Sequence, residues 1–396
     1  MSISPFLNIL VTMKQINKNI VLVLALVFAS IYSYAAPLVL KGTIGKSTIY
    51  LEIEEEGPEY FGKYFYQKQL IDIPIQGKLI NGVYKLNSYY EFSYGEEPIT
   101  ETFTFSKKGT KYVGKWMKGS KQLPLSLSPV PVAELSPKKL TTNKQLSSLT
   151  LTGINLPKLN YFKLKGNDTL TMHEGLRIKR FTEITTGIEI MRIDSGLTKS
   201  KMDFVNAHLE RMQIEFFFDM LDCSSYSGEL ADFGVNYSLG IINEDLFSMS
   251  FFNYYYCNGM PHPEEANYSY NLDLKSLKEL KHTDYLSDFA LASKDELTMF
   301  QKCLMNYFSK IEPELFDENT NEENSEVIGA ECAYYMSELW EPSVNVCFTR
   351  EGMQVIPYFS HMLAPCLEPE WAIIPYSELK GIIDEPYYSQ LLKIKP

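Results

Sequence analysis

The chain has 396 residues, of which 45% are hydrophobic and 13% aromatic, and its formal net charge is −12 at pH 7. This composition supports an ample folded core, while the acidity argues against binding to nucleic acid or to anionic membranes. Cationic partners are the ones that the charge favours.

Residues 1–35 have the features of a cleavable signal peptide. Two lysines come before an apolar run at residues 20–31, and the small residues Ser33 and Ala35 fit cleavage after Ala35. A second methionine opens a conventional signal sequence by itself, so residues 1–12 read as an upstream extension. The run is too short to span a bilayer comfortably, which makes an uncleaved anchor the less favoured alternative. We therefore predict a periplasmic or secreted protein that has no stable membrane insertion after cleavage.

Residues 36–130 predict a β-domain. Eight short segments of alternating polarity, separated by glycine turns, run through this part of the chain. Eight consecutive strands predict an antiparallel meander, either a small barrel or a sandwich. Within it, the sequence from Gly45 to Thr48 imitates the end of a phosphate-binding loop, but its glycine spacing is wrong and the segment reads as a hairpin turn. No nucleotide or other cofactor is predicted.

Residues 131–152 are rich in proline and polar residues and predict a linker, which leaves 153–396 as a second, α+β domain. Helices are expected at 199–220 and 294–311, packed on one face of an antiparallel sheet. The expected strands lie near 177–194, 232–242, 246–257, 266–274, 343–349, 353–359 and 371–375.

The helix at 294–311 has the clearest boundaries. Ser293 and Glu296 have the spacing of a capping box, and Pro313 ends the helix. Its expected apolar face consists of Leu297, Phe300, Leu304, Phe308 and Ile311.

Six cysteines lie in the second half of the chain, and an even number in an exported protein predicts disulfides. They are Cys223, Cys257, Cys303, Cys332, Cys347 and Cys366. Spacing favours Cys303 with Cys332 and Cys347 with Cys366, which leaves Cys223 for Cys257, so that all six are expected to be oxidised. The CxxC spacing of a zinc ribbon or a thioredoxin-like centre does not occur.

Two segments carry a resemblance to a known family: SMSFFNYYYCNGMPHPEEANYSYNLDLKSLKEL at 248–280 and VNVCFTREGMQVIPYFSHMLAPCLEPEWAIIPYSEL at 344–379. Over residues 155–385 the chain resembles the extracellular domain of RsiV-type anti-sigma factors, which also accompanies a polysaccharide deacetylase. The matching residues are Gly259, His262, Pro263, Asn271, Asp273, Ile374, Pro375, Tyr376 and Leu379. The departures are Met260 and Pro261 in place of an alanine, and the added cysteines.

The resemblance implies a sensing or binding domain, because RsiV-type members recognise lysozyme outside the cell. It does not extend to a sigma-binding segment or to a deacetylase domain, so neither of those activities is implied. Loss of the two signal-peptide lysines changes the formal charge to −14, which is opposite in sign to that of basic muramidases.

The turn around His262 allows several interpretations. A metal would need ligands from elsewhere in the chain, and catalysis would need a nucleophile that no recognisable motif supplies, so neither a metal site nor a catalytic residue is predicted. The flanking prolines instead favour a rigid structural turn, with partner contact as its second use. The tentative partner-binding residues are Gly259, His262, Pro263, Glu264 and Glu265.

Two classes of function follow. The first is an exported, non-enzymatic binding protein that recognises or inhibits a lysozyme-like hydrolase, or that acts as an immunity protein. The alternative is an envelope enzyme acting on glycan or peptide, since a glycosidase needs only two carboxylates.

Overall fold

The computed structural model describes residues 37–89, 101–135, 151, 153–171, 176–225, 229–257, 260, 262–286, 297–317, 332, 334, 336–340, 344–357, 366 and 370–393. The predicted signal peptide and Gly259 of the predicted turn lie outside these ranges. Within the ranges, every helix is too short or too polar to cross a membrane.

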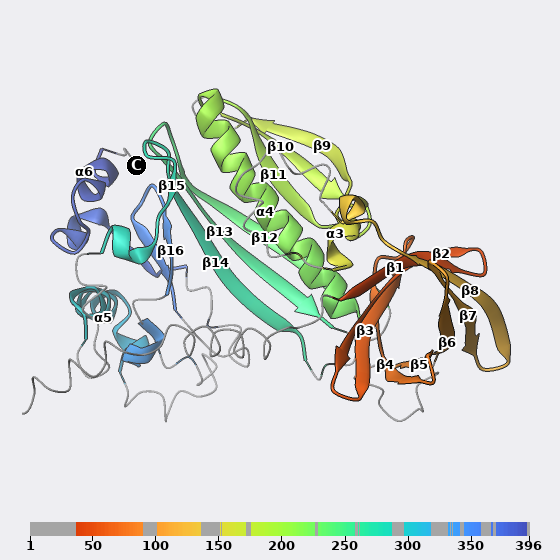
Figure 1. Ribbon diagram of the computed structural model, residues 1–396. Helices are drawn as coiled ribbons and strands as arrows, with labels where there is room; N and C mark the ends of the chain where they lie inside the picture. The colour runs from red at the N-terminus through yellow and green to blue at the C-terminus, as the bar shows by residue number, and fades with distance from the viewer. Residues whose placement is uncertain are drawn as a thin grey trace, which may run out of the picture.

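The N-terminal part of the chain forms a closed antiparallel barrel, at the right of Figure 1. Its strands are β1 (Leu38–Ile44), β2 (Ser47–Glu56), β3 (Glu59–Tyr66), β4 (Asp72–Ile80), β5 (Val83–Ser88), β6 (Glu101–Lys108), β7 (Lys111–Lys118) and β8 (Lys121–Pro129). Strand β1 pairs with β2 on one side and β8 on the other, so that Leu40 lies opposite both Leu51 and Pro129. The eight predicted strands are confirmed. Because β1 pairs with β8, the sheet closes on itself, and the domain is a barrel and not a sandwich.

Alternate side chains of the barrel strands fill its interior. Leu51, Tyr64 and Phe103 have no exposed surface, and Trp116 is 4% exposed. Glycine is required where neighbouring strands approach closely, because a Cβ atom at Gly62 would collide with the carbonyl oxygen of the strand beside it. The barrel is therefore a packed core and not an open tube.

Helix α4 (Lys199–Ser224) organises the second half and contacts two antiparallel sheets (Figure 1). The first sheet has the order β11-β10-β9 and the second the order β12-β13-β14-β15. Their strands are β9 (Leu164–Thr171), β10 (Arg177–Glu183), β11 (Glu189–Ser195), β12 (Asp232–Ile242), β13 (Leu246–Tyr256), β14 (Glu264–Asp273) and β15 (Lys278–Glu279). Apolar side chains of α4, such as Met212 and Phe216, share one core with Ile190 of β11 and Phe251 of β13.

The predicted α+β class with antiparallel sheets is thus confirmed, but one strand boundary was wrong. The segment predicted as a single strand at 177–194 is two strands, β10 and β11, joined by a turn in which Gly187 has a φ of 77°. Positive φ is the conformation that favours glycine, so this residue marks the turn. Strand β9 was not predicted.

A third antiparallel sheet and helix α5 (Met299–Ile311) form a separate apolar core near the C-terminus. The sheet consists of β16 (Asn345–Phe348), β17 (Met353–Ile356) and β18 (Ile373–Ile374). Aromatic rings dominate this core: Phe308 lies 4.9 Å from Trp340 and 5.3 Å from Trp371, measured between ring centroids. The short helices of the chain are η2 (Val132–Glu134), α3 (Asn155–Lys158), η5 (His282–Asp284), η7 (Pro313–Leu315), η8 (Ser337–Trp340), η10 (Tyr376–Leu379) and α6 (Tyr387–Leu391).

Helix α5 is confirmed as a helix, with a different start. Thr298 caps it: its hydroxyl accepts the N–H of Gln301 at 3.1 Å, and the Gln301 side chain accepts the N–H of Thr298 at 2.9 Å. The predicted cap residues Ser293 and Glu296 lie outside the described residues. Of the predicted apolar face, Phe300, Leu304 and Phe308 are buried, whereas Leu297 and Ile311 are exposed.

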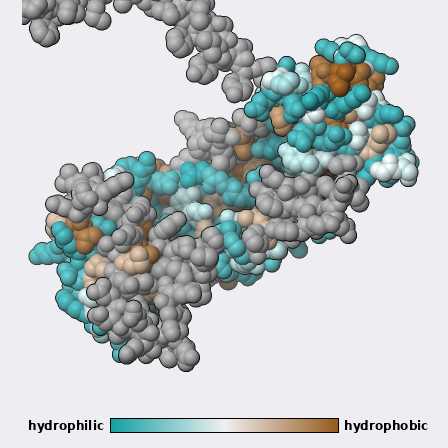
Figure 2. Space-filling model, turned by 90° about the horizontal axis from the view of Figure 1, so that it is seen from below, coloured by the Kyte–Doolittle hydropathy of each residue, from teal (hydrophilic) through white to brown (hydrophobic). Residues whose placement is uncertain are grey.

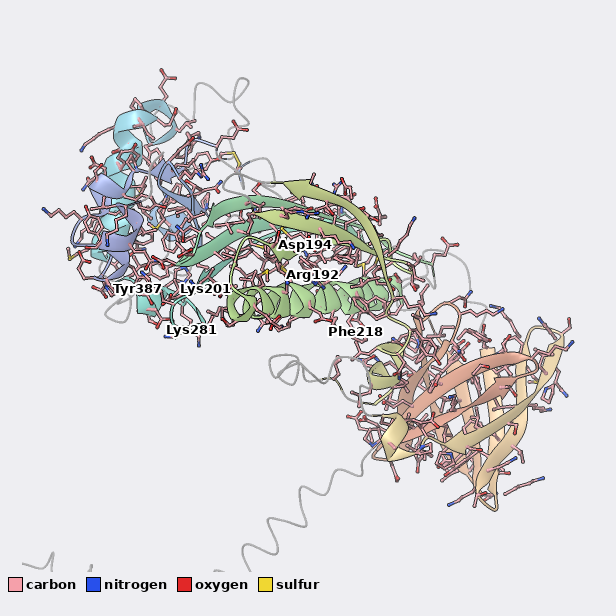
Figure 3. The ribbon with its side chains drawn as sticks, turned by 90° about the horizontal axis from the view of Figure 1, so that it is seen from above. Arg192, Asp194, Lys201, Phe218, Lys281 and Tyr387 are labelled. Atoms are coloured by element: carbon pink, nitrogen blue, oxygen red, sulfur yellow. A yellow bond between two sulfur atoms is a disulfide. The ribbon has the colours of Figure 1, made fainter. Side chains whose placement is uncertain are left out.

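The barrel and the second half share a buried apolar cluster, which we call the junction. Tyr50 and Phe65 on the outside of the barrel pack there with Ile214 and Phe217 of α4. Figure 3 shows Phe218 at the end of α4 that is nearest the barrel. The C-terminal end of α4 therefore packs against the outside of the barrel.

The structure corrects the predicted cysteine pairing. Cys223 pairs with Cys257 as predicted, with a Cα–Cα distance of 4.9 Å. Cys332, however, pairs with Cys366 and not with Cys303, which leaves Cys303 and Cys347 as free thiols. Spacing misled here because aromatic packing brings Cys366 to this place: Tyr334 donates its hydroxyl to the carbonyl oxygen of Cys366 at 2.9 Å.

Alkylation without reductant is expected to label two cysteines, in two stages. Burial raises the pKa of the half-buried Cys303 thiol, and it raises the pKa of Cys347, which is 1% exposed, to about 11. Because the thiolate is the reacting form, we expect slow labelling of Cys303 in the folded protein and labelling of Cys347 only after unfolding. Intact mass measures both steps. Unlabelled protein after denaturation would instead show that all six cysteines are oxidised.

Candidate functional site

The candidate site lies where the end of α4 meets the barrel, and we call it the junction cleft. It consists of two adjoining cavities of about 210 and 290 Å³ that share Asp219 and Asp222 as lining residues. The smaller cavity is lined also by Lys63, Asp72, Asn155, Lys158 and Phe218. The larger one is lined also by Cys223, Phe233, Asn253, Tyr255, Cys257, Met260 and Tyr268.

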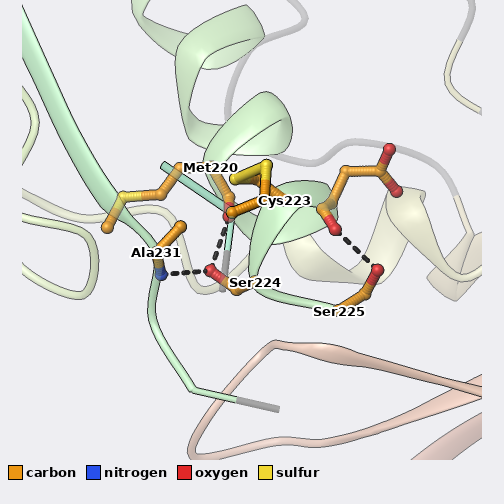
Figure 4. Close-up of a disulfide and its surroundings, with 7 residues drawn as sticks. Met220, Cys223, Ser224, Ser225 and Ala231 are labelled. Atoms are coloured by element: carbon orange, nitrogen blue, oxygen red, sulfur yellow. Dashed lines mark hydrogen bonds between the residues drawn. A yellow bond between two sulfur atoms is a disulfide. The ribbon is translucent and has the colours of Figure 1, made fainter. Parts of the chain in front are cut away.

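The last turn of α4 is fixed by covalent and polar contacts, drawn in Figure 4. The disulfide joins Cys223 on the helix to Cys257 at the end of β13. The Ser224 hydroxyl donates to the carbonyl oxygen of Met220 at 2.6 Å and accepts the N–H of Ala231 at 2.9 Å. These contacts position the acidic residues of this turn relative to β12 and β13.

Two acidic side chains of the cleft, Asp219 and Asp222, follow one face of α4, and Glu215 precedes them on the same face. Glu215, Asp219 and Asp222 are four and three residues apart, which is the spacing of neighbours on a helix surface. Burial, together with the smaller effects of the charges of Glu215 and Asp222, raises the pKa of Asp219 to about 6. Asp219 is therefore a carboxylate that a bound cation would stabilise.

The barrel side of the cleft holds a buried ionic group. Asp72, whose side chain is 5% exposed, lies 2.6 Å from the amine of Lys158 and 2.8 Å from that of Lys63. Lys158 is 1% exposed, and burial lowers its pKa. Asp222 interacts with both lysines, so its charge is partly balanced from within the protein.

The wall formed by the second sheet is aromatic and carries a buried amide. Phe233, Tyr255 and Tyr268 line the larger cavity beside Asn253, which is 4% exposed. The Oδ1 atom of Asn253 accepts no hydrogen bond within the described part of the chain. A buried carbonyl oxygen without a donor is unfavourable, and a ligand that donates an N–H group to it would remove that penalty.

The predicted turn borders the cleft without forming its floor. His262 is exposed, with Nδ1 3.1 Å from the carbonyl oxygen of Pro263 and 3.8 Å from Oε1 of Glu264. Glu265 belongs to the start of β14, where it pairs with β13. Met260, two residues before His262, lines the larger cavity. The tip of this turn and the cleft can therefore contact the same partner.

Sequence reasoning missed the residues at the centre of the cleft. The helical spacing of Glu215, Asp219 and Asp222 is visible in the sequence, but it is also the spacing of an ordinary solvated face. Only the packing of α4 against the barrel shows that this face is partly enclosed. In the ranges that the structure describes, His, Cys, Asp and Glu side chains do not gather in groups of three suited to a metal ion.

Comparison with known proteins gives partial likenesses in structure alone. No family model and no curated protein matches the chain. One similar solved structure is a DUF3298 family protein from Pseudomonas aeruginosa PAO1, with 12% identity, a TM-score of 0.34, and coverage of 56% of this chain and 94% of that one. Another is a member of the same family from Bacteroides fragilis NCTC 9343, with 11% identity, a TM-score of 0.33, and coverage of 59% and 99%.

Proposed function

We propose that the protein is an exported binding protein that captures a basic cell-wall hydrolase through the junction cleft. The observation that carries this proposal is the lining of the larger cavity, where Asp219 and Asp222 meet aromatic rings and the Asn253 oxygen that no described residue donates to. Carboxylate and amide oxygens accept the N–H groups of arginine and lysine, and aromatic faces attract the same cations. The chemistry of the cleft thus fits a basic side chain of a partner protein.

Two further observations support a lysozyme-like partner. The net charge of −12 creates a field that attracts a basic protein and speeds its encounter. The segments at 248–280 and 344–379 resemble the RsiV-type extracellular domain, some members of which recognise lysozyme. The first of these segments contains Asn253 and the turn at His262, both of which lie at or beside the cleft.

An envelope glycosidase is the second candidate, because a carboxyl with a pKa of about 6 beside a second carboxylate could act as a general acid. Glycosidases place their two carboxylates on opposite sides of the scissile bond. Asp219 and Asp222, however, are three residues apart on one helix and project from the same face. Their arrangement therefore favours binding a cation over flanking a glycosidic bond.

We expect calorimetry to detect binding of basic lysozymes. The double variant Asp219→Asn with Asp222→Asn should weaken this binding about 10- to 100-fold, because it removes two charge-assisted contacts. A matched control is Glu351→Gln with Glu370→Gln, which removes two exposed charges far along the chain and should change affinity less than about threefold. Glu264→Gln with Glu265→Gln tests the turn separately. Asp219→Asn alone guards against misfolding of the double variant, and thermal unfolding is followed for each protein.

Salt and pH provide a second check on the same interaction. Affinity should fall as the Debye length shortens from about 10 Å at 0.1 M salt to about 3 Å at 1 M. A bound cation favours ionised Asp219, so affinity should also fall as pH drops through about 6, where this carboxyl takes up a proton. Bovine albumin serves as the acidic control protein. Absence of binding by every lysozyme at low salt, or equal loss in the Glu351 and Glu370 control, would contradict the proposal.

A further inference from the structure

Another cavity lies at one mouth of the barrel, away from the junction cleft. The turns β1–β2, β3–β4 and β7–β8 are all at this end, because alternate turns of an up-and-down barrel lie at the same end. The cavity has a volume of about 630 Å³, which falls in the range of small-molecule sites. It is lined by Ile44, Lys46, Ser47, Thr48, Tyr66, Gln67, Lys68, Gln69, Trp116, Lys121 and Leu123.

Among the described residues that line this mouth, the charged ones are all lysines. Lys46, Lys68 and Lys121 come from three different turns, and none of the lining residues is acidic. None of the three amines forms an ion pair with a described residue. Three lysines that form no ion pair with a described residue thus surround one cavity, and their amines attract a small anion.

The floor of the mouth is held in place by a buried carboxylate. Glu101, whose side chain is 6% exposed, accepts the indole N–H of Trp116 at 3.0 Å and the amine of Lys118 at 3.1 Å. The hydroxyl of Tyr64 also donates to it. Trp116 therefore has a fixed orientation, and the amine of Lys121 lies 6.0 Å from the centre of its ring.

The interior of the barrel limits how far a ligand can enter. Leu51, Phe103 and Leu86 have no exposed surface, and they fill the space below the mouth. A long chain that runs through the barrel would have to displace this core. A ligand of the mouth is instead compact, with its body against Tyr66 and Leu123 and its charge among the lysines.

We propose that this mouth binds a small organic anion, a carboxylate or phosphate carried on a ring-shaped or apolar body. The lysines supply the charge, and the half-buried side chains of Tyr66 and Leu123 supply the contact surface, because aromatic and apolar side chains pack against sugar rings and alkyl chains alike. Figure 2 shows a hydrophobic patch on the barrel, in brown at the upper right, among hydrophilic residues. The site is separate from the proposed capture of a hydrolase.

Calorimetry on the full chain without its signal peptide tests the proposal with four probes: glucuronate, glucose as its neutral counterpart, decanoate, and inorganic phosphate. We expect glucuronate or decanoate to bind at least about tenfold more tightly than glucose or phosphate, because only the first two combine a charge with a body. The comparison of glucuronate with decanoate distinguishes a sugar acid from an alkyl anion. The proposal would be overturned if glucose or phosphate bound as tightly as the better organic anion, or if neither organic anion bound.

Variants then locate the site. Lys46→Ala with Lys121→Ala should weaken the better organic anion about tenfold, whereas Lys108→Ala with Lys111→Ala removes two exposed lysines at the opposite end of the barrel and should leave its affinity unchanged. In NMR spectra the indole N–H signal that disappears in Trp116→Phe should be the one that shifts on titration. Equal weakening by both lysine pairs, or a shift confined to other indole signals, would place the ligand elsewhere and refute the assignment.

Discussion

Replacing Asp72 with asparagine is expected to lower the free energy of unfolding by about 3–5 kcal/mol, the range for breaking a buried ion pair. Asp72 balances Lys158, whose side chain is 1% exposed, at 2.6 Å, and also Lys63 at 2.8 Å. Without the carboxylate, Lys158 would remain a buried and uncompensated cation, which is the origin of the large effect. Urea denaturation measures the change.

Two further variants distinguish this explanation from general damage to the barrel. Adding Lys158→Met to Asp72→Asn removes the uncompensated charge and should recover most of the lost stability. Glu59→Gln breaks the exposed pair between Glu59 and Lys78, which are 3.3 Å apart, and should change stability by less than about 1 kcal/mol. A loss in Asp72→Asn no larger than in Glu59→Gln, or no recovery by Lys158→Met, would show that the ionic group does not carry this stability.

The elements of the fold were predictable where they depend on local pattern. Alternating polarity and glycine turns marked all eight barrel strands, and the spacing of Phe300, Leu304 and Phe308 marked the buried face of α5. The choice between barrel and sandwich was not predictable, because it depends on pairing between β1 and β8, which are far apart in the sequence. Local periodicity contains no information on such a contact.

The junction cleft was less predictable for the same reason. The sequence drew attention to His262, which the structure places at an exposed turn beside the cleft. The sequence offered no reason to select Asp219 or Asn253, because their importance comes from tertiary packing. Asp219 is enclosed where α4 approaches the barrel, and Asn253 is buried beside the aromatic wall of the larger cavity. Composition favoured a cationic partner, and the acceptor oxygens of the cleft are the local feature that suits one.

Opening the disulfide between Cys223 and Cys257 is expected to have the second large effect. The bond closes a loop with a sequence separation of 34, for which the chain-entropy description gives a stabilisation of about 4 kcal/mol, within the usual range of about 2–5 kcal/mol. We expect a loss of this size from Cys223→Ala with Cys257→Ala, measured by urea denaturation. The matched control is Cys303→Ser, which alters a free and half-buried thiol and should cost less than about 1 kcal/mol.

The variant Cys223→Ala with Cys257→Ala also tests whether the disulfide keeps the cleft ordered in addition to stabilising the fold. Both cysteines line the larger cavity, and the bond holds the last turn of α4, with Asp219 and Asp222, against the strand that carries Asn253. Under conditions in which Cys223→Ala with Cys257→Ala is still folded, a basic partner should therefore bind more weakly, because part of its binding energy is used to order this turn. If affinity is unchanged while stability falls, the disulfide supports the fold alone, and the contacts of Ser224 with Met220 and Ala231 are sufficient to position the acidic face.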